Sequence, residues 1–90
     1  MLKITRAAEN EDMVLALSGR MTADNMVDLK TLLAAEAQSG RPIILDLQNI
    51  TLVDRDAVKF LERCEADSIR LKNCPAYVSE WISRERSRVT

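Results

Sequence analysis

The chain has 90 residues, of which 47% are hydrophobic and 30% charged, and its formal net charge is -1. This length suits one small domain with a modest core, since two cores need a longer chain. The near-neutral charge argues against a nucleic-acid-binding protein, because nonspecific binding depends on neutralising phosphates. We therefore expect a single domain over residues 1–90 that binds no nucleic acid.

Leader segments and metal sites are also disfavoured by the sequence. No apolar run approaches the roughly 18 residues of a membrane span, and residues 1–6 lack the apolar core of a signal peptide. We expect a cytoplasmic protein without direct membrane insertion. Cys64 and Cys74 are the two cysteines and histidine is absent, so a metal site would need carboxylates or a second chain. We predict no metal and two reduced thiols.

The first elements in chain order form a predicted hairpin. Leu2 and Ile4 alternate with polar residues, and a second apolar segment runs from Met13 to Leu17 after the polar turn at 9–12. Two such segments joined by a short polar turn are typical of paired antiparallel strands. Residues 18–21 then break the pattern.

A helix is predicted to begin after Thr22, whose hydroxyl suits an N-cap position. Ser39 and Gly40 end it, as a C-terminal glycine commonly does. Apolar residues recur at three- and four-residue offsets between these points, and Lys30 and Glu36 are expected to point outward. The apolar positions are Met26, Leu29, Leu32, Leu33 and Ala37.

A strand followed by a helix is predicted for residues 43–64. The strand Ile43–Leu47 is almost wholly apolar, which is typical of a strand covered on both faces. Asp54 is predicted to cap the helix, with Asp56 in its first turn, and both charges favour the positive end of the helix dipole. The helix face consists of Ala57, Val58, Leu61 and Cys64.

The last predicted elements are an edge strand at 68–72 and a helix with Pro75 near its first turn. A charged tail is expected over residues 84–90. The order strand, strand, helix, strand, helix, strand, helix predicts an α/β fold, with a four-stranded mixed sheet packed by three to four helices.

Two aromatic residues of the last helix share one face. Tyr77 and Trp81 lie four positions apart. The simpler interpretation is that Trp81 packs with Val78 and Ile82 against the sheet. The alternative is an exposed aromatic patch that docks a partner or a second copy, so a homodimer is one expected assembly.

The segment from 45 to 57 resembles the signature region of STAS domains, found in bacterial anti-sigma-factor antagonists and in sulfate transporters. The matching residues are Leu45-Asp46-Leu47 and Val53-Asp54. In the antagonists, Asp-Ser-Ser-Gly then opens a helix. Here Arg55 and Asp56 stand where the two serines would be, and Ala57 where the glycine would be.

The resemblance implies a non-catalytic interaction module of bacterial signalling and transcription regulation. Its partner would be an anti-sigma factor that is also a serine kinase, and the surface it implies includes Thr22 and Asp24 beside Asp54, Arg55 and Asp56. Phosphorylation of the family serine is unavailable, because an aspartate stands at that position.

Other phosphorylation sites and functions remain open. Thr51 and Ser68 are the weak candidates for phosphorylation. A second context of the same resemblance is the STAS-like cytoplasmic subunit of a phospholipid-transport ATPase, with an ABC-type ATPase as partner. A competitor of another class is a small enzyme that uses Asp54 or Asp56 as an acid or base.

Arg55 has two interpretations of its own. It forms a solvated ion pair with the neighbouring aspartates, or it reaches a partner carboxylate or a nucleotide phosphate. No cofactor is expected, and nucleotide binding is kept only as an alternative.

Overall fold

The computed structural model describes residues 2–88, and the order of its elements is the predicted one. The elements are β1 (Leu2–Glu9), β2 (Asp12–Met21), α1 (Ala23–Ala37), β3 (Ile43–Val53), α2 (Arg55–Ala66), β4 (Arg70–Lys72) and α3 (Ala76–Arg88).

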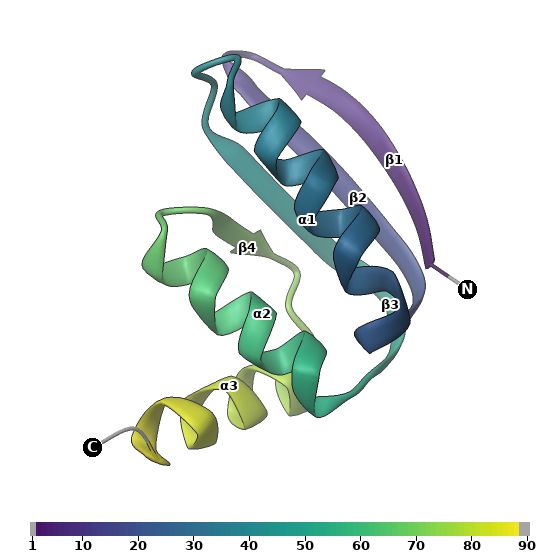
Figure 1. Ribbon diagram of the computed structural model, residues 1–90, viewed down its shortest axis with the longest axis vertical. Helices are drawn as coiled ribbons and strands as arrows, with labels where there is room; N and C mark the ends of the chain where they lie inside the picture. Colours follow the sequence, from purple (N-terminus) through teal and green to yellow (C-terminus); the bar gives the residue numbers. More distant parts are fainter. Residues whose placement is uncertain (1, 89–90) are drawn as a thin grey trace.

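The strands form one mixed sheet in the order β1-β2-β3-β4. β1 pairs with β2 antiparallel, whereas β2 with β3 and β3 with β4 are parallel. α1 and α2 lie in front of this sheet, and α3 packs beside α2 (Figure 1). The predicted α/β class with a four-stranded mixed sheet is confirmed, and the described residues form three helices, of which α1 and α2 cover the sheet.

The core lies between the sheet and the helices. Leu15, Leu45 and Leu47 are at most 1% exposed on the helix-covered face, and full burial of each such side chain is worth about 1.5 to 3 kcal/mol. Ile44 and Asp46 alternate with them and are only half-buried on the opposite face. The expectation that this strand is covered on both faces was therefore wrong, because α1 and α2 cover one face only.

The two central strands are longer than the apolar pattern indicates. β2 continues to Met21 and β3 to Val53. Their pairing shifts register between Ala16 and Ser18 and again at Gly19, where a φ of 101° favours glycine. Because each shift displaces the two-residue alternation, the sequence pattern breaks although the strand continues.

α1 buries one residue that was expected outside. Met26, Leu29 and Leu33 face the core as predicted, but Glu36 is also buried, with 6% exposure. Its carboxylate forms an ion pair with Arg6 of β1, which explains how the charge tolerates this position. The prediction of an outward Glu36 was wrong.

α3 replaces most of the expected charged tail. The helix extends to Arg88, so residues 84–88 are helical, and the rest of the predicted tail lies outside the described residues. Trp81 is half-buried against the core that contains Val78 and Ile82, α3 packs mainly on α2, and Tyr77 is 49% exposed. None of the described helices is both long and apolar enough to cross a membrane.

The two cysteines have different surroundings. Cys64 is a buried core residue of α2, as predicted, and Cys74 is half-buried just before α3. Burial raises the pKa of the Cys64 thiol to about 12, and the nearby Asp67 and Glu65 carboxylates add to the shift. Burial also raises the pKa of Cys74. Both are free thiols with little tendency to ionise near neutral pH.

Candidate functional site

The starts of α1 and α2 lie at the same end of the sheet (Figure 1). Each helix follows one of two neighbouring parallel strands, and the carboxyl ends of parallel strands meet at one edge. The backbone N–H of Asp54 donates to the carbonyl oxygen of Met21 at 3.3 Å, which joins the two turns. Residues 22–24 and 54–56 are therefore neighbours.

Asp54 connects the two helix starts through its side chain. Its Oδ1 accepts a hydrogen bond from the N–H of Ala57 at 2.9 Å, which confirms its predicted N-cap role in α2. Its Oδ2 accepts a second bond, also 2.9 Å long, from the N–H of Ala23 in α1. One carboxylate thus satisfies unpaired amides of two helices and lies at the positive end of both dipoles.

Thr22 caps α1 together with a residue that the sequence analysis missed. The N–H and the hydroxyl of Thr22 both donate to Oδ1 of Asn25, at 3.1 and 3.2 Å. The spacing Thr-x-x-Asn has the form of a capping box, so this partner was visible in the sequence. The half-buried Thr22 side chain is therefore occupied within the domain.

Asp24 and Asp56 are exposed in the first turns of α1 and α2. They place two negative charges at the same end of the sheet. Thr51 is also exposed, on β3 shortly before the turn. Ser68 lies beyond the other end of α2, at a φ of 69°, so the structure does not bring it to this surface.

Arg55 pairs with a residue from another element. Its Nε lies 3.5 Å from Oε1 of Glu85 on α3. The arginine side chain is 59% exposed and the glutamate 8%. Arg55 therefore forms an ion pair, as one interpretation predicted, but its partner is Glu85 and the predicted partners, the neighbouring aspartates, were wrong. Glu85 follows the buried Val78 and Ile82 at helical spacing, and this spacing was the available signal for its burial.

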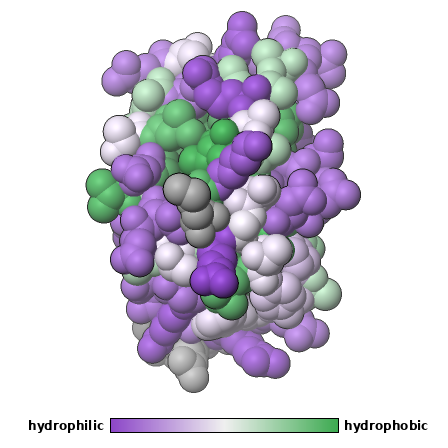
Figure 2. Space-filling view, turned by 90° about the vertical axis from the view of Figure 1, so that its right-hand side faces the viewer, coloured by the Kyte–Doolittle hydropathy of each residue, from purple (hydrophilic) through white to green (hydrophobic). Residues whose placement is uncertain are grey.

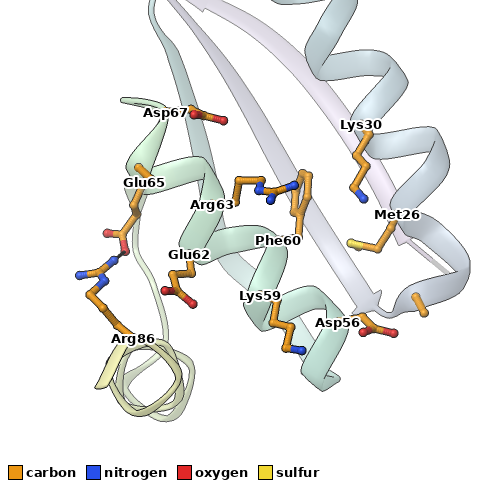
Figure 3. Close-up of a pocket in the computed structure, with 12 residues that line it drawn as sticks. Met26, Lys30, Asp56, Lys59, Phe60, Glu62, Arg63, Glu65, Asp67 and Arg86 are labelled. Carbon is orange, nitrogen blue, oxygen red and sulfur yellow. Dashed lines mark hydrogen bonds and ion pairs between the residues drawn. The ribbon is translucent and has the colours of Figure 1, made fainter. Parts of the chain in front are cut away.

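A groove of about 960 Å³ runs between α1 and α2 beside these residues. Figure 3 shows Phe60 pointing between the helices, with Met26 and Lys30 of α1 on the opposite wall. The α2 wall carries charges of both signs, among them Asp56 and Lys59. The groove therefore offers mixed polar contacts around a small apolar floor.

The chemistry available at these helix starts is recognition through charge and hydrogen bonds. Asp54 has both carboxylate oxygens bound to backbone amides. Among residues 2–88, no three potential ligands approach one another closely enough to hold a metal ion. We call Thr22, Asp24, Asp54, Arg55 and Asp56 the helix-start surface. It combines two exposed aspartates and one exposed arginine on a frame fixed by Asp54.

Comparison with known proteins gives a family match and similar folds among solved structures. The family model described as "Mlab, STAS domain" matches residues 4–84. A solved structure of an uncharacterized DUF3478-family protein from Shewanella loihica PV-4, titled as having a SpoIIAA-like fold, shares 15% identity at a TM-score of 0.54. The match covers 99% of this chain and 79% of that one.

A second solved structure, titled as that of Mglu, shares 18% identity at a TM-score of 0.62. The match covers 80% of this chain, but this chain spans only 19% of the length of that protein. At such identities the two structures show the fold alone. Curated proteins gave no match. Because the family model covers nearly the whole sequence, the chain belongs to the STAS domain family described under the name Mlab.

Proposed function

We propose that this chain is a non-catalytic docking module that binds a protein partner through the helix-start surface. STAS domains generally mediate interactions between proteins, and their fold is generally not that of an enzyme. The observation that carries the proposal is the Asp54 bridge. Both oxygens of Asp54, the aspartate that the signature turn shares with the family, bind backbone amides, and these bonds join the two helix starts that carry the flanking charges.

The binding is proposed to be constitutive. Asp56 stands at the position of the family's phosphorylated serine and is exposed. An aspartate has no hydroxyl group that a kinase could phosphorylate. An aspartate has one negative charge, whereas a phosphoserine has about 1.5 to 2 and three acceptor oxygens, so Asp56 imitates the phosphorylated state only weakly. A fixed charge of this kind suits a partner that stays bound.

The partner that best fits constitutive binding is an ABC-type ATPase, with this chain as the cytoplasmic subunit of a phospholipid transporter. The description of the matched family by the name Mlab, and not by that of an antagonist, supports this context. An anti-sigma factor with serine kinase activity is the second candidate, supported by the SpoIIAA-like fold of a structural neighbour.

Binding to purified candidates tests both the surface and the partner. Immobilised chain is exposed to the ATPase subunit and, separately, to the serine kinase from the same cell, and the Kd is measured by interferometry. We expect the ATPase to bind without prior phosphorylation, and Asp56→Arg to weaken binding by roughly tenfold or more, because it reverses an exposed interfacial charge.

Glu11→Arg is the matched control, since it reverses an exposed charge in the β1–β2 turn at the opposite end of the sheet. Equal Kd values for both variants would refute the helix-start surface. Tighter binding to the kinase than to the ATPase would assign the chain to signalling instead. Phosphate found on Thr51 or Ser68 by mass spectrometry, if it controlled binding, would contradict the constitutive mode.

A further inference from the structure

The two edges of the sheet differ in how they are protected. β4 has three residues, and its Arg70 and Lys72 side chains are both exposed and positive, which discourages pairing with another strand. β1 has eight residues, contains no proline, and pairs without interruption with β2. In the described part of the chain, β2 alone pairs with the β1 backbone.

The open side of β1 therefore presents a row of unpaired backbone groups. In an antiparallel pair, the peptide groups that do not bond to the partner strand point away from it. Such a row is a ready template for another strand, and β1 lies at the outer margin of the molecule along its whole length (Figure 1).

A partly exposed apolar strip accompanies this edge. Leu2 and Ile4 are half-buried on the helix-covered face of β1. Leu32 of α1 is also half-buried, and it lies four residues before Glu36, which contacts Arg6 of β1, so it faces the same side. Figure 2 shows this side of the molecule, with a hydrophobic area among hydrophilic surroundings in its upper half. A strand added to β1 would cover part of this strip.

The charges on β1 are complementary to those of a second β1. Lys3 and Glu9 lie near opposite ends of the strand, on the sheet face that α1 and α2 do not cover. Both are exposed, and neither forms an ion pair among residues 2–88. Antiparallel pairing about a two-fold axis at Arg6 places Lys3 of each copy opposite Glu9 of the other. The two Arg6 residues lie opposite each other at this axis, and in each copy the arginine forms an ion pair with Glu36.

We propose that two copies of this chain associate through β1, in antiparallel register centred on Arg6, and so form one continuous eight-stranded sheet. The interface is isologous, because the same strand contributes from both copies. It uses backbone hydrogen bonds for affinity and the two Lys3 and Glu9 pairs for register. The association leaves the helix-start surface free and does not depend on the function proposed for it.

Charge reversal and its rescue test this arrangement. Sedimentation equilibrium of the full chain is expected to give a dimer whose Kd rises roughly 3- to 30-fold in Lys3→Glu or Glu9→Lys, because each puts two like-charged pairs across the interface. The double variant Lys3→Glu with Glu9→Lys is expected to restore the original Kd. Glu11→Lys, in the adjacent turn, is the control that should leave the Kd unchanged.

Cysteine crosslinking checks the register independently of charge. The proposed pairing places Thr5 of one copy opposite Ala7 of the other, at a Cβ separation of about 4.5 to 5.5 Å. A mixture of Thr5→Cys and Ala7→Cys chains should therefore form a heterodimeric disulfide faster than either variant alone. A monomer at all concentrations up to about 1 mM, or a double variant as weak as the single ones, would overturn the proposal.

Discussion

Asp54 and Glu36 are two carboxylates that link elements distant in the sequence, but their surroundings differ. Asp54 binds two backbone amides, those of Ala23 and Ala57, at a half-buried position. Glu36 is almost completely buried and is paired with the side chain of Arg6, which is 57% exposed. Backbone amides stay in place when a side chain is changed, whereas an arginine partner can be removed.

This difference separates two ways of stabilising a charge inside a small domain. At Asp54 the helix ends supply fixed donors and favourable dipoles, so a substitution removes only the carboxylate and leaves the donors in place. At Glu36 the burial is tolerated only while the cation from the edge strand is present. Substitutions on either side of each contact should therefore have unequal effects on the free energy of unfolding.

The largest loss is expected from Asp54→Ala. It removes the N-cap of α2 and two charge-assisted hydrogen bonds, at a cost of about 2 to 4 kcal/mol in the free energy of unfolding. Unfolding in urea, monitored by circular dichroism, measures this loss in the free energy of unfolding. Asp54→Asn should lose less, since an amide oxygen can still accept one bond. Asp24→Ala, an exposed aspartate of the neighbouring helix start, is the control, and an equal loss there would contradict the special role of Asp54.

Arg6→Met should cost about 1 to 3 kcal/mol, because it leaves the buried Glu36 without its cation. Adding Glu36→Met should recover most of that loss, since no buried charge then remains. The same urea experiment on the two single variants and the double variant measures their coupling. Strictly additive losses would mean that the ion pair contributes nothing of its own.

Cys64 shows what burial does to an ionisable group without a cationic partner. Its folded-state pKa is raised from 9.0 to about 12, so its contribution to stability is fully present below about pH 9 and is lost as the pH rises toward 12. At about pH 10 the loss should be roughly 1 kcal/mol. The difference in pH dependence between the original chain and Cys64→Ala isolates this thiol. Parallel stability curves would disprove the assignment.

The smallest effect is expected for Arg55→Met, below about 1 kcal/mol. Arg55 is 59% exposed, its nitrogen lies 3.5 Å from the Glu85 oxygen, and Glu85 has a further interaction in the domain. Thermal unfolding compared with Arg6→Met gives the ranking directly. A loss at Arg55 as large as that at Arg6 would show that the two buried glutamates depend on their arginines to the same degree.

The sequence predicted the fold well because local periodicity carries most of it. The core face of α2, from Ala57 to Cys64, and the cap at Asp54 depend on residues within a few positions of one another. The burial of Glu36 could not be predicted in this way, because it depends on Arg6, which is thirty positions earlier in the chain. The full length of β3 was missed for a similar reason, since its irregular pairing with β2 is a property of two strands.

The candidate site was predicted in its location but not in its connections. The choice of residues 22–24 and 54–56 came from the STAS resemblance, and the structure places them together. The second hydrogen bond of Asp54 and the Glu85 partner of Arg55 join different elements, so their geometry follows only from the packed structure. The assignment of a partner to this surface stays a prediction.

The Asp54 bridge also has a consequence for the motions of the domain. Ala23 and Asp54 are 31 positions apart, yet a single carboxylate binds an amide in the first turn of each helix. Fraying of one helix start therefore removes one of the two hydrogen bonds that hold this shared carboxylate in place for the other start. In hydrogen exchange, the amides of Ala23 and Ala57 should lose protection together, so that the two strand-to-helix units open as one cooperative segment.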